Sequence, residues 1–286
     1  MQLHRFDSVE PFWQQAQEYL LNHEAEHNAL LGNLHTLLHC PERRPASLYF
    51  ALVQTKDTIL AIAIRTATNK ILLSKAQDLQ ALTLIAQDVV QGVQHQEQVP
   101  GVGGLVAEVE AFVDTWQTLT GQSCQRTLEM RIHQLTQVEP VPTVSGALRR
   151  ATESDRPLLI QWFTAFDADI GMALNQDVEQ LVDSRLQQQN IYLWEDGVPV
   201  SMVGGKPFSA TAGRIAPVYT PPEYRRKGYA TASVAALSQK LLDEGCDRCF
   251  LFTDLANPTS NHIYQQVGYR PICDWHDYSF TFKESA

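Results

Sequence analysis

The sequence predicts an α/β protein made of two similar halves, each a sheet flanked by helices. Segments with strand-like apolar alternation are interspersed with segments whose apolar residues repeat at helical spacing. The same order of elements occurs twice along the 286 residues. Residues 137–145, "QVEPVPTVS", separate the two halves and hold two prolines without a periodic pattern, as is typical of an extended linker. We therefore expect domains at 1–136 and 146–286.

The second half begins with a short strand and two helices. A hairpin follows, turning at Asp196-Gly197. The next helix carries an apolar stripe of Ala230, Val234, Leu237 and Leu241 and ends at Gly245. A later short helix has Ser260 as its expected cap and Gly268 as its stop. The strands are expected at 146–152, 191–205 (the hairpin), 214–220, 249–254 and 278–282, and the helices at 153–166, 176–189, 229–244 and 260–267.

The first half shows a comparable order. Two helices are expected at its start, with a break between them near His23. The helix before the last strand is expected to end at Gly121. The helices are expected at 10–23, 26–38, 79–91 and before 121, and the strands at 48–54, 58–66, 70–74, 103–108 and 126–135.

Charge and composition limit the functions that this chain can have. Its net charge is -10, and both halves are acidic, with 9 Lys+Arg against 15 Asp+Glu in residues 1–143 and 13 against 17 in residues 144–286. This balance argues against a nucleic-acid partner. No apolar run approaches the ~20 residues that span a bilayer, and no secretory signal is evident, so we expect a cytoplasmic protein without a membrane partner. The odd number of cysteines favours reduced thiols: Cys40, Cys124, Cys246, Cys249 and Cys273.

One stretch, "PEYRRKGYATAS" at 222–233, concentrates positive charge at the start of a helix. Free amide groups and the helix dipole make such a start a binding site for phosphate or carboxylate. Gly228 permits a positive φ and a close approach of the backbone, while Arg225, Arg226 and Lys227 can add charge-assisted hydrogen bonds. The stretch predicts a site for an anion of pyrophosphate size. The alternative is a solvated loop whose cations are incidental.

Two motifs in the second half resemble the GNAT superfamily of acyl-CoA-dependent N-acyltransferases. The first is the Arg/Gln-x-x-Gly-x-Gly/Ala loop, present as Arg225, Gly228 and Ala230. The second is an Asn-Pro-x-Ser-Asn-x-x-Tyr run before Gly-Tyr, present as residues 257–264 before Gly268-Tyr269. The resemblance covers about 146–286. It implies two tandem GNAT-like domains, each with a mixed, mostly antiparallel sheet flanked by helices, and acetyl-CoA as co-substrate without a metal.

The resemblance also assigns roles to residues. The amides from Arg226 to Thr231, including those of Lys227, Gly228, Tyr229 and Ala230, would hold the coenzyme A pyrophosphate. The backbone of Val218, Tyr219 and Thr220 would pair with the pantetheine arm, which Asn257 would also bind, and Asn261 belongs to the same motif. Tyr264 would point at the thioester sulfur.

The implied reaction transfers an acetyl group to a primary amine of a small molecule or peptide. An uncharged amine attacks the thioester carbonyl, and an amide of Val218 or Tyr219 stabilises the oxyanion. Tyr264 then protonates the leaving thiolate as a general acid. The sequence assigns no general base, and Glu223 is expected to be solvated. Asp167 and Asp169 could hold a cationic amine or could simply face water.

The first half lacks the chemistry of the second. "LSKAQDLQAL" stands where the second half has its cationic glycine turn, and Gln117 precedes Gly121 as Tyr264 precedes Gly268. An amide cannot act as a proton-donating acid. We therefore expect a degenerate first domain and an active second one.

Three other interpretations compete with this one. His23–His27, "HEAEH", fits the HExxH pattern of zinc hydrolases, and His35 and His39 offer further imidazoles, but the expected helix break at His23 argues against one continuous face. Cys246 and Cys249 form a lone CxxC pair, which favours structural thiols. The third alternative is an acyl-CoA-binding or regulatory protein that performs no transfer.

Overall fold

The computed structural model describes residues 1–39, 48–66, 70–93, 99–170 and 177–281. It divides into two compact units. The first comprises residues 1–133, 252–257 and 271–286, and the second comprises residues 134–251 and 258–270. The units thus interleave along the chain, whereas the sequence predicts contiguous domains. The last strand of the chain belongs mainly to the first unit.

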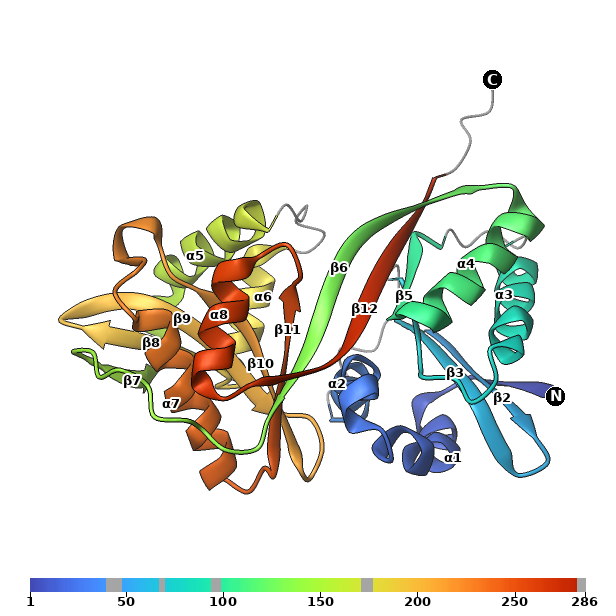
Figure 1. Cartoon of the computed structure of the whole chain (residues 1–286), viewed down its shortest axis with the longest axis horizontal. Coiled ribbons are helices and arrows are strands. Elements are labelled where there is room, and N and C mark those ends of the chain that lie inside the picture. The colour runs from blue at the N-terminus through green and yellow to red at the C-terminus, as the bar shows by residue number, and fades with distance from the viewer. Residues whose placement is uncertain (40–47, 67–69, 94–98, 171–176, 282–286) are drawn as a thin grey trace. The chain divides into compact units, whose positions relative to one another are not determined.

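The first unit contains a mixed sheet in the order β1-β2-β3-β4-β5-β12-β6. Its pairs are antiparallel from β1 to β4 and parallel between β4 and β5, and β12 pairs antiparallel with β5 through Trp275 opposite Leu105. Figure 1 shows β12 running beside β6 in this sheet. The strands are β1 (Gln2–Phe6), β2 (Leu48–Thr55), β3 (Thr58–Thr66), β4 (Ile71–Leu73), β5 (Gly101–Leu105), β6 (Ser123–Leu135) and β12 (Arg270–Thr281), and the helices are α1 (Val9–Leu21), α2 (Glu24–His39), α3 (Gln80–Val93) and α4 (Val106–Thr120).

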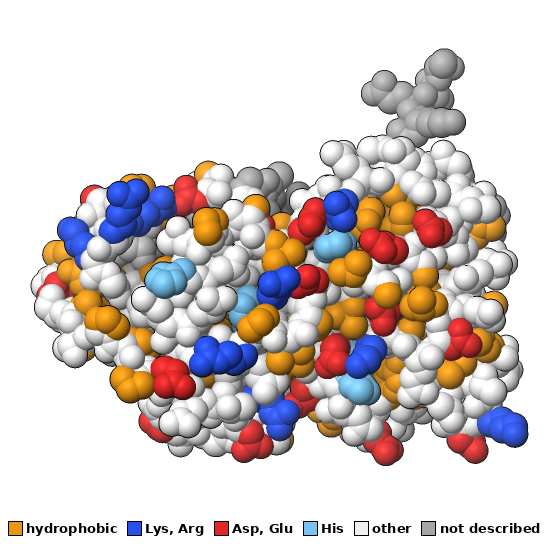
Figure 2. All heavy atoms as spheres, in the orientation of Figure 1, with side chains coloured by type: hydrophobic (Ala, Val, Ile, Leu, Met, Phe, Trp, Pro, Cys, Tyr) orange, Lys and Arg blue, Asp and Glu red, His pale blue; other side chains and the backbone are white. Residues whose placement is uncertain are grey.

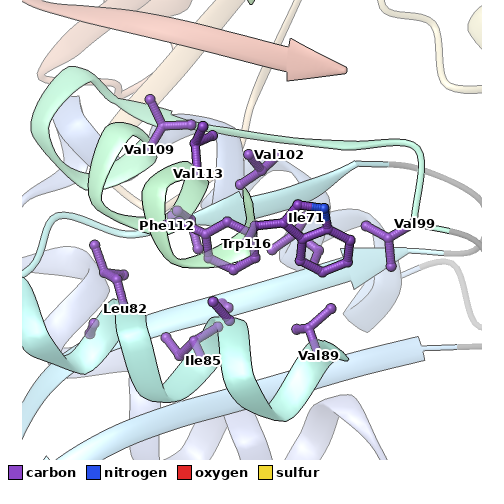
Figure 3. Packing of buried hydrophobic residues seen from close by; sticks show 14 of the residues in the cluster. Ile71, Leu82, Ile85, Val89, Val99, Val102, Val109, Phe112, Val113 and Trp116 are labelled. Carbon is purple, nitrogen blue, oxygen red and sulfur yellow. The ribbon is translucent and has the colours of Figure 1, made fainter. Parts of the chain in front are cut away.

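Helices α3 and α4 bury their apolar faces against this sheet. Leu82, Ile85 and Val89 of α3 repeat at helical spacing and meet Phe112 and Trp116 of α4 in one cluster (Figure 3). The Trp116 ring also stacks on Phe280 of β12, with 4.5 Å between ring centroids. Residues near the C-terminus are therefore part of the core of the first unit.

The second unit contains a sheet in the order β11-β10-β9-β8-β7. Only the β10–β11 pair is parallel. The strands are β7 (Ala147–Arg150), β8 (Ile191–Asp196), β9 (Val198–Pro207), β10 (Ala212–Tyr219) and β11 (Arg248–Asp254), and the helices are α5 (Arg156–Asp169), α6 (Val178–Gln187), α7 (Tyr229–Asp243) and α8 (Pro258–Val267), with short 3-10 turns at Glu153–Asp155 and Pro222–Tyr224.

Helices cover both faces of the second sheet, and β10 shows how. Tyr219 packs in the cluster of α5 and α6, whereas its neighbour Val218 packs against the cluster of α7 and α8. Successive side chains of a strand point to opposite faces. The sheet therefore separates α5 and α6 from α7 and α8.

Most predicted elements are confirmed, but one strand was missed and three boundaries are wrong. β1 was not predicted. Strand β5 ends at Leu105 because α4 already begins at Val106. Helix α8 starts at Pro258, so Ser260 lies in its first turn instead of capping it. β12 begins at Arg270, eight residues before the predicted strand.

None of the helices in the described part of the chain is long and apolar enough to cross a membrane.

Four of the five cysteines are described, and none of these four forms a disulfide; Cys40 lies outside the described residues. Cys246 and Cys249 are both buried, and burial raises the pKa of the Cys249 thiol to about 12. This thiol is therefore protonated and unreactive at neutral pH.

Candidate active site

Strand β10 is paired along most of its length with β9 but over a shorter stretch with β11. On the β9 side its register runs from Gly213 to Tyr219, with an irregularity between Ile215 and Val218. On the β11 side the parallel register ends at Arg214 and Phe250. Backbone groups of an unpaired strand edge are ready to hydrogen-bond an extended ligand. Because neighbouring N–H groups of a strand point in opposite directions, one of Val218 and Tyr219 faces this edge.

The loop after β10 leads into α7, and its backbone amides are the feature that could bind a ligand. Arg226 and Gly228 both have positive φ, 62° and 85°. Gly228 occupies the N-cap position, and no side chain caps the helix. The first backbone bond of the helix is from the Ala232 amide to the Gly228 carbonyl, at 3.0 Å. The amides from Arg226 to Thr231 thus have no acceptor among the described residues, and the helix dipole adds to their positive potential.

The three cations of this loop differ in their contacts. Arg225 Nε donates to the Thr220 carbonyl at 2.9 Å, and Nη2 donates to Asp169 Oδ2 at 2.5 Å. The Arg225 guanidinium also lies over the Tyr219 ring, 5.9 Å from its centroid. Lys227 Nζ lies over the Tyr224 ring at 5.5 Å, and Arg226 is exposed. The sequence grouped the three as anion ligands, but the Arg225 side chain is already engaged by protein groups.

Tyr264 lies on α8 in the same unit as this loop. Its side chain is 8% exposed and packs in the cluster that includes Ile215 of β10 and Val234 of α7. Burial raises the pKa of Tyr264 to about 12. The hydroxyl has no hydrogen-bond partner among the described residues. It is therefore protonated at neutral pH and available as a donor.

The asparagines of the second motif flank the start of α8. Asn257 is exposed, and its backbone N–H donates to the backbone carbonyl of Asp254 at 3.0 Å. Asn261 is half-buried and lies one turn before Tyr264. Their roles toward a ligand remain predictions from the motif.

The corresponding loop of the first unit has its amides occupied. After β4, the Lys75 amide donates to His27 Nε2 and the Ala76 amide donates to Glu108 Oε1, each at 3.0 Å. At the start of α3, the Gln80 amide donates to Asp78 Oδ1 at 2.9 Å. A carboxylate on a helix N-terminus both satisfies the amide and repels an anion. Asp78 is visible in the sequence as a helix-start residue, whereas the contributions of His27 and Glu108 depend on the fold.

His27 cannot serve as a zinc ligand in this structure. Its Nδ1 lies 3.0 Å from the Leu20 carbonyl, while Nε2 accepts from Lys75. The side chain is fully buried, and burial lowers its pKa to about 4. The predicted break is confirmed, since α1 ends at Leu21 and α2 begins at Glu24. Across the described residues no group of three or more His, Cys, Asp or Glu could hold a metal ion.

The acidic residues that could bind a cationic amine differ in their contacts and exposure. Asp169, at the end of α5, is paired with Arg225 and so is not free for a cationic amine. Asp167 is half-buried, and burial raises its pKa. Glu223 is exposed, as expected. The part of the predicted acceptor region at 171–176 lies outside the described residues.

These features coincide with a known protein family. Residues 156–269 match the model of the acetyltransferase (GNAT) family. This part of the chain is a GNAT acetyltransferase domain. The match spans α5 to the end of α8, and so includes the β10 edge, the loop and Tyr264.

Solved structures share the fold of the whole chain, which is that of two tandem GNAT domains. A GNAT-family acetyltransferase from Colwellia psychrerythraea is 12% identical, with a TM-score of 0.58 over 99% of this chain and 100% of the other. A GCN5-related N-acetyltransferase from Sphaerobacter thermophilus is 15% identical, with a TM-score of 0.63 over 97% and 95%. A tandem GNAT protein from the clavulanic acid biosynthesis pathway is 10% identical, with a TM-score of 0.58 over 99% and 100%. No curated protein matches the chain.

Proposed function

We propose that the second unit transfers an acetyl group from acetyl-CoA to a primary amine by direct attack in a ternary complex. The observation that carries this proposal is the helix start at Gly228, where the amides from Arg226 to Thr231 have no acceptor among the described residues. A pyrophosphate supplies the acceptors that such amides require. Arg226 is exposed beside them and adds positive charge.

The unpaired edge of β10 is evidence for where the pantetheine arm of the coenzyme would bind. The amides and carbonyls of this arm would continue the sheet beside Val218, Tyr219 and Thr220, in the manner of an added strand. The Val218 or Tyr219 amide that faces this edge would stabilise the oxyanion formed when the amine attacks the thioester carbonyl. Asn257 and Asn261 would complete the binding of the arm.

The properties of Tyr264 fit the last step of the proposed reaction, protonation of the leaving thiolate. When the tetrahedral intermediate collapses, the C–S bond breaks and the sulfur leaves with its electron pair as a thiolate. A tyrosine whose pKa is about 12 is protonated at neutral pH, so its hydroxyl can donate a proton to the developing thiolate. The nitrogen of the product loses a proton to solvent, and the tyrosinate takes up a proton from solvent, so the products are the amide and the free thiol of coenzyme A and Tyr264 is neutral again.

The surface charge supports a small or peptide acceptor. On the face shown in Figure 2, Lys and Arg side chains lie in separate small groups among acidic and hydrophobic ones. The net charge is -10. An acidic protein attracts cationic amines over long range and repels polyanions.

Calorimetric titration with acetyl-CoA tests the proposal. The matched variant is an Arg226→Glu, Gly228→Asp double substitution, which places two carboxylates where the pyrophosphate would bind. Saturable binding by the wild type and its loss in a folded variant are the expected results. Absence of binding to the wild type would refute the acetyltransferase proposal, whereas binding without turnover of any amine would favour a non-catalytic acyl-CoA protein.

A further inference from the structure

Residues 137–145, which the sequence predicts to be a linker, have a regular pattern of burial. Val138, Val141 and Val144 are half-buried, and every residue between them is exposed. A period of three is that of polyproline II, which has three residues per turn, and Pro140 and Pro142 favour this conformation. The segment, called the strap below, therefore presents one valine edge to the second unit, to which it belongs.

The first end of the strap is anchored to the end of α8. The Glu139 amide donates to the Val267 carbonyl at 2.9 Å. Next to it, Gly268 has a φ of 113°, and a Cβ there would lie 2.8 Å from the Gln137 carbonyl oxygen. Val138 and Val141 pack against the cluster that contains Tyr264 and Val267. The helix that carries the proposed general acid is thus held by the strap.

The other end is anchored at the start of α7. A Cβ on Gly228 would lie 2.8 Å from Val144 Cγ1, and Val144 packs against the cluster that contains Ala232. Ser145 Oγ donates to Asp196 Oδ2 at 2.6 Å, and the Tyr229 hydroxyl donates to the same oxygen at 2.6 Å. The Ser145 carbonyl in turn accepts from Trp194 Nε1 at 2.9 Å. The proposed pyrophosphate loop is therefore held by the same segment.

We propose that the strap is a positioning element of the acetyltransferase domain, in addition to being a connection along the chain. It fixes the end of α8 relative to the start of α7, and so fixes Tyr264 relative to the amides at Gly228. Catalytic groups lose much of their effect when displaced by about 1 Å, and a polyproline II segment is stiff enough to hold such a spacing. The inference rests on the proposed function for its catalytic meaning.

The test uses the full chain with Val138, Val141 and Val144 all changed to Ser, which removes the valine edge and keeps the length. A Val→Ile triple variant at the same positions is the conservative rescue, and Val178→Ser, at a half-buried valine of α6, is the matched control. Amide hydrogen exchange is measured without ligand, and acetyl-CoA affinity is measured by calorimetry. In the Ser triple variant we expect faster exchange at 228–232 and 264–268, and affinity weaker by on the order of tenfold. The Ile variant and Val178→Ser should leave both unchanged.

Unchanged exchange and unchanged affinity in the Ser triple variant would overturn the inference. If the wild type fails to bind acetyl-CoA, the proposed function is refuted, while hydrogen exchange still decides whether the strap holds the two helices. If the triple variant does not fold, single variants decide: Val144→Ala should raise exchange at 228–232 only, and Val138→Ala at 264–268 only. Exchange that rises equally at both ends in each single variant would contradict the two-anchor arrangement.

Discussion

Arg225 of the loop donates to Asp169 of α5 at 2.5 Å while its Nε holds the Thr220 carbonyl at 2.9 Å. The same guanidinium covers Tyr219, whose ring also meets Phe166 of α5, with 6.5 Å between the ring centroids. The Arg225 side chain thus connects the end of β10 and the loop with α5, which lies on the face of the sheet opposite to α7. In this structure the arginine of the loop motif contacts other groups of the protein.

Changing Asp169 distinguishes this role from direct phosphate binding. If Arg225 shapes the loop through its protein partners, Asp169→Asn and Arg225→Ala should both weaken acetyl-CoA binding several-fold, and Asp169→Glu should restore it. If Arg225 instead binds phosphate and Asp169 competes for it, Asp169→Asn should tighten binding. Both side chains are more than two-fifths exposed, so the pair contributes at most about 1 kcal/mol to stability. Calorimetry and thermal unfolding together separate the two cases.

Tyr264→Phe should reduce kcat by about 10²–10⁴-fold without changing acetyl-CoA affinity, because only the proton donor is lost. The control is Tyr269→Phe in the same cluster, where the hydroxyl pairs with Ser238 at 2.8 Å, and which should affect stability but not kcat. An unaltered kcat in a folded Tyr264→Phe variant would exclude Tyr264 as the acid.

The pH dependence follows from the direction of the Tyr264 shift. A general acid must be protonated, so its activity declines as pH rises through its pKa, here about 12. The wild-type kcat should therefore show no descending limb between pH 8 and 10. A decline in that range that disappears in Tyr264→Phe would contradict the assignment.

A titration should find one acetyl-CoA bound per chain. In the first unit the amides of Lys75, Ala76 and Gln80 are already bonded to His27, Glu108 and Asp78. Replacing Asp78 by Ala removes one of these acceptors and leaves the other two, so it should not create a second site. A stoichiometry of two in the wild type would contradict the description of the first unit as degenerate.

His27 should make the first unit sensitive to acid. Burial lowers its pKa to about 4, below the ordinary value near 6.5. The unfolded chain therefore takes up a proton at a higher pH than the folded chain does. The free energy of unfolding should decrease as pH falls from 6.5 towards 4, by up to about 3 kcal/mol.

Thermal unfolding of the wild type and of His27→Gln between pH 7 and 4.5 checks this expectation. The variant should begin less stable and show a shallower decrease. His39→Gln is the control, because His39 is exposed and should keep the wild-type slope. Equal slopes in wild type and His27→Gln would assign the acid sensitivity to other groups.

Local signals in the sequence were sufficient for much of the site. Gly228 was predicted to permit a positive φ, and its φ is 85°, because the need for glycine there is encoded within a few residues. The helix pattern before Gly245 and the Asp196-Gly197 turn are local in the same sense, and both are confirmed. By contrast, Asp169, the charged partner of Arg225, comes from a helix more than fifty residues away, which no local pattern reveals.

The errors in the fold have a similar origin. β1 is short and half-exposed, so its alternation is weak, and its strand conformation comes from pairing with β2. The first three residues of β12 are exposed and show no apolar alternation, and the strand that they begin is placed between β5 and β6. The valine period of the strap was present in the sequence, but a period of three is typical neither of a helix nor of a strand.

The place of β12 has a consequence for how the protein is made. The ribosome delivers β5 about 170 residues before β12, yet the two are paired in the same sheet, and Phe280 completes the core around Trp116. The first unit is therefore begun early but cannot finish folding until β12 has been synthesised, and until then β5 and β6 lack the strand that lies between them. A nascent chain of this kind exposes unpaired strands for longer than one whose domains are contiguous, and loss of β12 should damage the half of the protein that was made first.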